Sequence, residues 1–356
     1  MNILISQASI VPQGPGIIGA FKQIEKVGRA CWASENLITD NSYEKFVEGL
    51  MNREHNAPLE HGTLYLIYLI GSPMYDPYYV VHFDDVRKFK QNPYSRVVEK
   101  KFDVAAQAKD SEWMHSFVEQ YGPTTAYFVT TNLRVIVENF SKEEVEKVLD
   151  HSVNNPYKEH QLRVTVHFTC QRAISAEFNR HRKDSIMERS SRYCNFSKDK
   201  FGNEIGIVQP DWVPVEDIEE RTFEEYCKDI SLHDDYQRED DIRRVEYPWS
   251  KFDYWIFANL ACEYSYMNLL WLGCKPEEAR DILPMDLQTE LYHTAFIDDW
   301  EHFFKLRAWQ SKGNKPHPEA KKLARQVFDK FVELGLVSEQ LRIDNEIVDE
   351  APVAKS

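Results

Sequence analysis

The sequence predicts a mostly helical α+β fold built around a central antiparallel sheet. Apolar residues recur at helical spacing in several long segments, and short runs of β-branched and aromatic residues lie between them. Of the 356 residues, 42% are hydrophobic and 13% are aromatic, so the chain can bury a large core. This length suits one large domain or two ordinary ones, and no boundary is sharp enough to require two.

The first predicted elements are two helices followed by a strand. Apolar residues at helical spacing predict helices at 16–30 and 42–54, the second with Ser42 as its N-cap. A polar turn at 55–61 then leads into the β-branched and aromatic run 63–70, which predicts a strand.

The middle of the chain is more mixed. Residues 74–122 are polar with helical patches, and 124–138 fit either a strand or a helix. Residues 141–150 predict a short helix, since its first and fourth residues have the spacing of a capping box. Residues 162–170 alternate β-branched and polar side chains, which predicts a strand, and 172–182 fit a helix start or a bend.

The C-terminal part is predicted to be helical. Residues 197–250 are polar and acidic, and the strongly apolar helix that follows carries Trp255 and Trp271. Helices are predicted at 217–232, 254–274, 275–280 (with proline in its first turn), 297–309 and 316–334. Residues 336–356 are taken as an acidic C-terminal tail, of which 344–356 are predicted to be loose.

The segment 180–193 concentrates basic and hydroxyl groups. It reads Arg-His-Arg-Lys-Asp-Ser-Ile-Met-Glu-Arg-Ser-Ser-Arg-Tyr, in a chain of formal net charge -15. Arginine offers forked donors that match oxyanions, so this segment is predicted to hold an anion. The alternative is a solvated helix face, which usually alternates Glu and Lys rather than being rich in Arg. The acidic overall balance argues against broad nucleic-acid binding.

This segment resembles the signature R-H-R-x-x-S-x-N-E-x-S-x-R-Y of the flavin-dependent thymidylate synthases. Every specified position matches except one, because Met187 stands where the family has Asn. Residues 54–65 resemble the family's G-H-x-S-P-x-E-H-x-x-F/Y element, and 276–284 and 303–307 resemble its P-E-x-A-R-x-x-L-P and F-x-x-L-R elements. The resemblance covers about residues 20–70 and 165–335.

The resemblance implies a reaction, its cofactors and an assembly. Family members add a methyl group to C5 of dUMP to give dTMP, with methylenetetrahydrofolate as the carbon donor and NADPH-reduced FAD as the hydride source. The cofactor carries the difficult chemistry, and no cysteine nucleophile is needed. The family also implies a homotetramer whose active sites are shared between subunits.

The resemblance also implies site residues. The expected FAD contacts are His61, Thr63, Arg180, His181, Arg182 and His302. The expected dUMP contacts are Glu177, Glu188, Ser190, Arg192, Arg280 and Arg307. No metal site is expected.

Some of these residues have narrower expected roles. Arg307, Ser190 and Glu188 are the expected catalytic residues, with Arg307 polarising the uracil carbonyls. Arg192 and Arg280 are expected to bind the phosphate, with Ser190 donating to it. A serine among arginines without an adjacent base is not an activated nucleophile.

Two of the assignments have structural alternatives. His61 could be a capped turn histidine before a strand. Arg307 could be a surface arginine paired with Glu301 or Glu319.

Several features depart from the family pattern. Met187 loses a polar contact in the motif loop, Glu177 stands where relatives often have Gln, and Phe296 and His302 occupy a region where relatives use asparagines. These changes leave room for an altered cofactor geometry or substrate preference. Residues 1–335 are predicted to form one family-like domain in which about 75–160 are an insertion.

Cysteine usage and hydropathy bear on the compartment. The six cysteines are scattered without a C-x-x-C pair or zinc spacing, which predicts reduced, mostly buried thiols in a cytoplasmic protein. No apolar run approaches the roughly 18 residues of a membrane span. The expected partners are therefore small molecules, with no nucleic acid and no membrane.

Three other functional classes are compatible with the motif. The first is a nucleotide-binding homologue that has lost or altered its catalysis. The second is a flavoenzyme that transfers another one-carbon group to a pyrimidine nucleotide. The third is an RNA-binding or structural protein that uses the Arg-rich segment, against which the acidic balance speaks.

Overall fold

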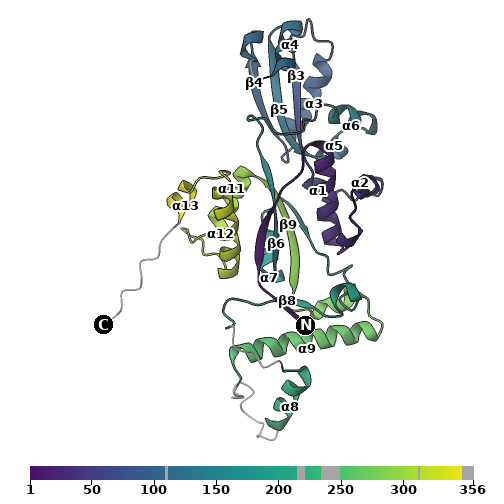
Figure 1. The fold of residues 1–356 in the computed structure, drawn as a ribbon, viewed down its shortest axis with the longest axis vertical. Helices are drawn as coiled ribbons and strands as arrows, with labels where there is room; N and C mark the ends of the chain where they lie inside the picture. Colours follow the sequence, from purple (N-terminus) through teal and green to yellow (C-terminus); the bar gives the residue numbers. More distant parts are fainter. Residues whose placement is uncertain (109–110, 215–220, 234–248, 312, 347–356) are drawn as a thin grey trace, which may run out of the picture.

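The computed structural model describes residues 1–108, 111–214, 221–233, 249–311 and 313–346. Figure 1 shows an elongated molecule with a lobe at one end, a central sheet, and a layer of helices at the other end. Helices hold many more residues than strands, and the two larger sheets are antiparallel, which confirms the α+β prediction. A short parallel pair, β1 (Asn2–Leu4) with β8 (Gly206–Val208), adds to them.

The central sheet has four antiparallel strands. Their order is β2 (Gln7–Val11), β6 (Arg163–Gln171), β9 (Gln288–Phe296) and β7 (Ser185–Glu188). The β6 sequence alternates apolar and polar residues, so Val166 and Phe168 point to one face, and Thr165 and Thr169 to the other. This alternation confirms the strand predicted at 162–170.

Different helices pack on the two faces of the central sheet. Helices α7 (Arg172–Phe178), α11 (Ile297–Arg307) and α12 (Pro318–Glu333) cover one face and bury its apolar side chains, among them Leu291 and Ala295. Helix α1 (Gly16–Cys31) covers the other face, where Tyr292 packs against Val27 and Ala30. We call these the α11 face and the α1 face.

The α11 face depends on a cluster of aromatic rings. Phe331 is fully buried, with its ring centroid 5.4 Å from that of Trp300 and 5.3 Å from that of Phe304. Replacing Phe331 by alanine should lower the free energy of unfolding by about 3–5 kcal/mol, because it removes buried area and leaves a cavity. Urea unfolding measures this loss. The exposed Ile343 of α13 (Gln340–Asn345) is the control, since its alanine variant should change stability by less than about 1 kcal/mol.

The upper lobe contains a separate three-stranded antiparallel sheet. Its order is β3 (Thr63–Ile70), β5 (Thr124–Asn132) and β4 (Arg96–Phe102). Helix α3 (Tyr79–Gln91) packs on one face together with α1 and α2 (Ser42–Asn52), and α4 (Glu112–Tyr121) packs on the other. Two short helices follow β5, namely α5 (Leu133–Asn139) and α6 (Lys142–Leu149).

This lobe holds most of the predicted insertion. Residues 75–160 share its sheet with β3, which comes before them in the chain. That the segment is an insertion relative to the family stays a prediction.

The lower layer is built on the long helix α9 (Lys251–Trp271). Ser250 and Asp253 form a capping box at its start, and α8 (Phe223–His233) and α10 (Pro276–Ala279) pack beside it. Within the described parts of the chain, no helix is both long enough and apolar enough to cross a membrane.

The structure corrects several predicted elements. The strands β2, β4, β7 and β9 were not predicted, and Met187 lies in β7 rather than in a loop. Ser42 is the first residue of α2 and Asn41 is its N-cap, while the Ser42 hydroxyl donates to Glu25 Oε2 (2.8 Å).

Other predictions were correct in part. Residues 124–138 form both a strand and a helix, and the capping box predicted at 141–150 is present. The predicted helix at 217–232 begins at Phe223, with 217–220 outside the described residues. Of residues 344–356, which were predicted to be loose, Asp344 and Asn345 form the end of α13, and 347–356 lie outside the described residues.

Candidate active site

The basic motif begins in a tight turn and ends in an edge strand of the central sheet. Helix α7 ends at Phe178, and the backbone N–H of His181 donates to the Phe178 carbonyl (3.1 Å). Asp184 Oδ2 lies 2.7 Å from His293 Nε2, and both side chains are buried. Since His293 belongs to β9, this contact fastens the turn to the centre of the sheet.

A cleft of about 640 Å³ opens beside this turn, and we call it the arginine cleft. Its lining residues are Arg180, His181, Arg182, Lys183, Asp184, Asp299, His302, Leu306, Arg307 and Asn314. The structure thus brings together four of the predicted flavin residues and Arg307. Among the described residues, none forms a hydrogen bond or ion pair with the exposed side chains of Arg180, Arg182 and Lys183. This cleft therefore presents unpaired positive charge.

Arg307 is held in place inside this cleft. Its Nη1 donates to the Glu177 carboxylate, its Nη2 to the Glu177 carbonyl (2.8 Å), and its Nε to His181 Nε2 (3.3 Å). Burial, with His293 nearby, lowers the pKa of His181 to about 4, so the ring is neutral near pH 7 and accepts this bond. Burial also lowers the pKa of Arg307. The partner of Arg307 is Glu177, not Glu301 or Glu319.

Glu188 is turned toward α7. One carboxylate oxygen accepts from Ser175 Oγ (2.7 Å) and the other from Asn179 Nδ2 (3.2 Å). Arg172 lies 3.7 Å away. Ser175 and Asn179 thus hold the Glu188 carboxylate, and Glu188 does not line the arginine cleft.

Ser190, Arg192 and Arg280 lie beyond the other end of β7. Arg192 is exposed and pairs with Glu277 (3.1 Å) on α10, and the exposed Arg280 begins the next helical turn. Within the described chain, the Ser190 hydroxyl accepts only the Arg192 N–H (3.3 Å), and no base is bonded to it. The predicted dUMP contacts are therefore divided between the two ends of β7.

His61 and Thr63 lie on the α1 face, opposite the arginine cleft. His61 Nδ1 lies 2.8 Å from Thr294 Oγ1, and Thr63 is tied to Gln13 and Arg163. Both are buried. The His61 ring thus joins the helical turn η2 (Ala57–His61) to β9, which fits its structural alternative, and its flavin contact stays a prediction.

The buried His61 gives the fold a pH dependence. Burial lowers its pKa to about 3, with smaller effects of Arg163 and His293. In the unfolded chain the ring takes a proton near pH 6.5. The contribution of the buried neutral ring to the free energy of unfolding is therefore complete above about pH 6.5 and is lost as the pH falls toward the folded pKa. When the pH is lowered from about 7 to 4.5, the free energy of unfolding should fall by about 2–3 kcal/mol less in His61→Gln than in the wild type.

Urea unfolding of both proteins at both pH values measures this difference. His55→Gln is the control, because the His55 side chain is exposed, and it should behave as the wild type does. Parallel losses of stability in the wild type and His61→Gln would rule out the contribution of His61.

A second cleft of about 870 Å³ lies on the α1 side of β7, and we call it the aromatic cleft. Its lining residues are Arg29, Cys31, Trp32, Ser34, Phe46, Arg53, Glu54, His55, Asn56, Ala57, Pro58, Arg134, Glu138, Met187, Ser190 and Tyr193. The N-terminal motif meets the central motif here through residues 54–58, and not through His61 or Thr63. None of residues 54–58 was predicted to belong to the site, although they stand in the N-terminal motif.

The cysteines near the motif are not activated. Burial raises the pKa of Cys194 and raises that of Cys31 to about 11, which keeps both thiols protonated. Cys170 and Cys194 are buried, whereas Cys227 is exposed and the other three are half-buried, so the prediction of mostly buried thiols is wrong. Within the described residues, no group of three or more His, Cys, Asp or Glu side chains could hold a metal ion.

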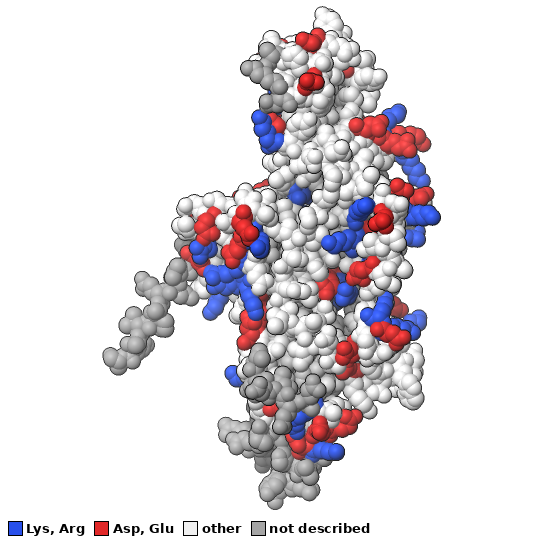
Figure 2. Space-filling view, viewed as in Figure 1, with Lys and Arg blue, Asp and Glu red and all other residues white. Residues whose placement is uncertain are grey.

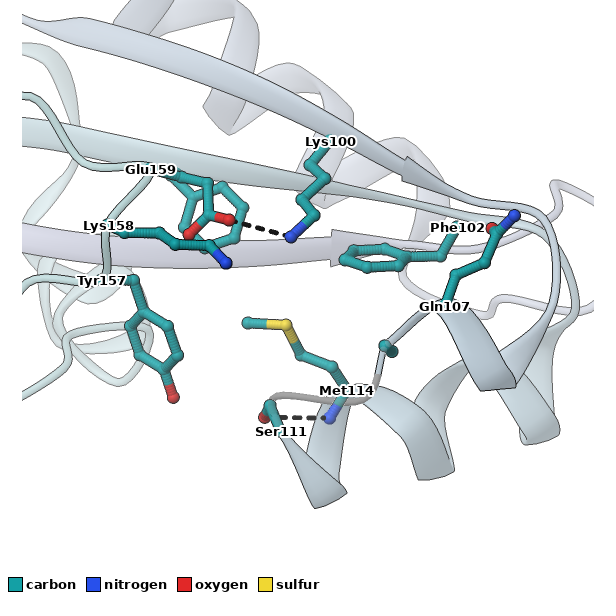
Figure 3. Close-up of a pocket in the computed structure, with 10 residues that line it drawn as sticks. Lys100, Phe102, Gln107, Ser111, Met114, Tyr157, Lys158 and Glu159 are labelled. Carbon is teal, nitrogen blue, oxygen red and sulfur yellow. Dashed lines mark hydrogen bonds and ion pairs between the residues drawn. The ribbon is translucent and has the colours of Figure 1, made fainter.

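A third pocket, of about 250 Å³, lies in the upper lobe and contains none of the predicted site residues. Figure 3 shows Met114 and Phe102 on its walls and the Lys100–Glu159 pair (2.9 Å) at its edge. On the surface drawn in Figure 2, basic and acidic side chains are intermixed and form no broad basic area.

A profile of the family described as thymidylate synthase complementing protein matches residues 104–334, more than half of the chain. The chain belongs to this family. The match confirms the resemblance to flavin-dependent thymidylate synthases that the motifs indicated. No curated protein matches the chain significantly.

Two solved structures of the UMP/dUMP methylase PolB from Streptomyces cacaoi are similar to the chain. The one bound with 5-Br dUMP is 14% identical, with 98% of this chain and 100% of that chain covered and a TM-score of 0.39. The one bound with 5-Br UMP is 12% identical, with 97% and 96% covered and a TM-score of 0.38.

The two clefts hold the kinds of side chain that FAD requires. The unpaired cations Arg180, Arg182 and Lys183 suit its pyrophosphate. The flat rings of Trp32, Phe46 and Tyr193 in the aromatic cleft suit the stacking of a planar ring. The residues present therefore fit the cofactor that the family implies.

Proposed function

We propose that this protein is a flavin-dependent thymidylate synthase that converts dUMP to dTMP. Membership of the family supports a methyltransferase-type enzyme that acts on dUMP. The observation that carries the finer proposal is that Arg180, His181, Arg182, His302 and Arg307 line one cleft with unpaired positive charge.

Arg307 is proposed to activate the uracil ring. C5 becomes nucleophilic when negative charge moves onto the ring carbonyls, and a fixed guanidinium stabilises that charge. The bonds to Glu177 and His181 hold its plane before substrate binds. Glu177 and Glu188 would border the nucleotide.

Arg192 and Arg280 are proposed to hold the dUMP phosphate, with Ser190 donating to it. Both arginines are exposed, and the Arg192–Glu277 pair is a surface pair that costs little to open. Ser190 would bind and not attack, since no base is bonded to its hydroxyl within the described chain.

The cofactors follow from the family. Bound FAD, reduced by NADPH, supplies the hydride that turns the carbon from methylenetetrahydrofolate into a methyl group. Arg180, His181, Arg182 and His302 would bind the flavin from the arginine cleft. The contacts of His61 and Thr63 with the flavin, and a location in the cytoplasm, belong to this proposal as predictions.

A homotetramer with shared sites would complete the active site. The predicted dUMP contacts lie at opposite ends of β7, and β7 is an edge strand whose outer side pairs with no described strand. In addition, α9 and its C-terminal cap expose the large apolar side chains of Tyr254, Tyr264, Trp271 and Leu272. These features support contacts between copies of the chain.

Mixing two inactive variants tests the shared site. Arg307→Ala removes one half of the proposed site, and Arg192→Ala removes the other. Co-expression should restore roughly a quarter of the wild-type activity if each site takes the two halves from different copies. No restoration, with both variants in the wild-type oligomeric state, would place the whole site in one copy.

The mass of the product tests the reaction itself. The purified protein with FAD, NADPH, methylenetetrahydrofolate and dUMP should form dTMP. A nucleotide that carries a different one-carbon group would support the altered flavoenzyme. Binding of dUMP without any product, in folded protein that contains flavin, would support the homologue that has lost catalysis.

A further inference from the structure

We propose that a cavity between Arg163 and the N-terminus of α1 binds a phosphate group, either as inorganic phosphate or as part of a larger phosphorylated molecule. The cavity has a volume of about 240 Å³. It lies on the α1 side, and none of its lining residues lines the arginine cleft or the aromatic cleft. We call it the Arg163 cavity.

Arg163 is a buried cation with no carboxylate of the described residues within ion-pair distance, although Glu60, Asp184 and Asp299 lie near enough to act on its pKa. Its exposed fraction is 8%, its Nη2 donates to Ser185 Oγ (2.9 Å), and its Nη1 donates to the Glu60 carbonyl (3.1 Å) and Thr63 Oγ1 (3.3 Å). Its Nε has no hydrogen-bond partner in the described part of the chain. Burial lowers its pKa to about 10. A buried guanidinium is costly unless its charge is paired, so this geometry favours an anion.

The start of α1 adds a second source of positive potential. Gly14, Pro15 and Gly16 line the cavity, and the helix has 16 residues, no acidic residue in its first turn, and no side chain that caps it. Helix N-termini carry partial positive charge, which favours phosphate. The Gly16 N–H donates to the Asn154 carbonyl (2.8 Å), which joins the start of α1 to the opposite wall of the cavity. Gly16 has a φ of +60°, a conformation that favours glycine.

The remaining wall is neutral and polar. The cavity is lined by Gln13, Gly14, Pro15, Gly16, Thr63, Leu64, Tyr65, Val153, Asn154, Asn155, Pro156 and Arg163. No carboxylate is among these residues, although the formal net charge of the chain is -15. Amide and hydroxyl groups around an arginine provide the short hydrogen bonds that a tetrahedral oxyanion accepts.

Phosphate binding to the full-length protein tests this proposal. Isothermal titration with inorganic phosphate is carried out on protein that carries both Arg182→Glu and Arg192→Ala, in which anion binding at the arginine cleft and at the proposed dUMP phosphate site is weakened. One saturable site per chain is expected. Adding Asn155→Asp, which puts a negative charge at the exposed rim of the cavity, should weaken binding at least tenfold. Adding Asn36→Asp, the same change at an exposed position outside the cavity, should not.

Arg163→Gln is the second variant and should abolish binding. If Arg163→Gln does not fold, Asn155→Asp still tests the phosphate site, because the Asn155 side chain is exposed and its replacement should leave the fold intact. Absence of saturable binding, or binding that Asn155→Asp leaves unchanged, would overturn the proposal.

Repeating the titration with saturating FAD, on protein that keeps Arg182 and carries only Arg192→Ala, distinguishes the two sources of the phosphate. Unchanged phosphate binding that depends on Arg163 would show a site for free phosphate. Competition by FAD that also depends on Arg163 would show that the cavity receives the pyrophosphate of the dinucleotide. Competition that Arg163→Gln does not affect would contradict a site at Arg163.

Discussion

Replacing Arg307 by lysine should lower kcat/KM for dUMP by about 10²–10³-fold, mostly through kcat. The guanidinium donates at once to the Glu177 carboxylate, the Glu177 carbonyl and His181, and these bonds fix its plane. Lysine keeps the charge but cannot reproduce the fork. Because the proposed role is to stabilise charge that develops in the transition state, substrate binding should suffer less than turnover. Steady-state kinetics with varied dUMP measure both parameters.

Arg342→Lys is the matched control for this variant. Arg342 lies on α13 and pairs with Glu339 and Glu346, and it lines neither cleft. It should keep the wild-type kcat and KM. If Arg307→Lys also kept kcat within about twofold, Arg307 would have no part in the chemical step.

Replacing Arg182 by glutamate should weaken FAD binding by about 100-fold. The change removes a charge-assisted hydrogen bond, worth about 1.5–3 kcal/mol, and adds a charge that repels the pyrophosphate. Arg182 is exposed at the arginine cleft, and no described residue pairs with it, so the variant should fold normally. Titration of the apoprotein with FAD, followed by flavin fluorescence, measures the dissociation constant without any turnover.

Arg87→Glu makes the same change of net charge in the upper lobe. Arg87 lies on α3, where it pairs with Asp84 (3.1 Å) at the surface. Its variant should bind FAD as the wild type does. Equal weakening in the two variants would point to a general effect of net charge, and the arginine cleft would then not be the flavin site.

The parts of the fold that the sequence predicted well have a simple periodic pattern. Helix α1 has apolar residues at helical spacing, and β6 alternates Val166 and Phe168 with threonines, so one face of each element is plainly apolar. The basic motif was equally clear, because four arginines stand in a strongly acidic chain. These local signals were sufficient to predict an anion site and the family.

Strand β9 was not predicted because both of its faces carry polar groups. His293 on one face bonds to Asp184, and Thr294 on the other bonds to His61 and Thr165. Each polar side chain is satisfied only by a residue distant in sequence, so the local pattern does not read as a strand.

The arrangement of the site also depends on tertiary structure. His61 and His181 stand on opposite faces of the central sheet, and residues 54–58 meet Ser190 only because α1 lies across the sheet. A motif match states which residues matter together, but it does not give the face on which each one lies.

The most direct test of the proposed function is tritium release from dUMP labelled at C5, with purified protein, FAD, NADPH and methylenetetrahydrofolate. The loss of the C5 hydrogen is required for methylation at that carbon. We predict release that requires both NADPH and the folate and that Arg307→Lys reduces in proportion to kcat. No release, from folded protein shown to contain flavin, would contradict the assignment of this protein as a thymidylate synthase.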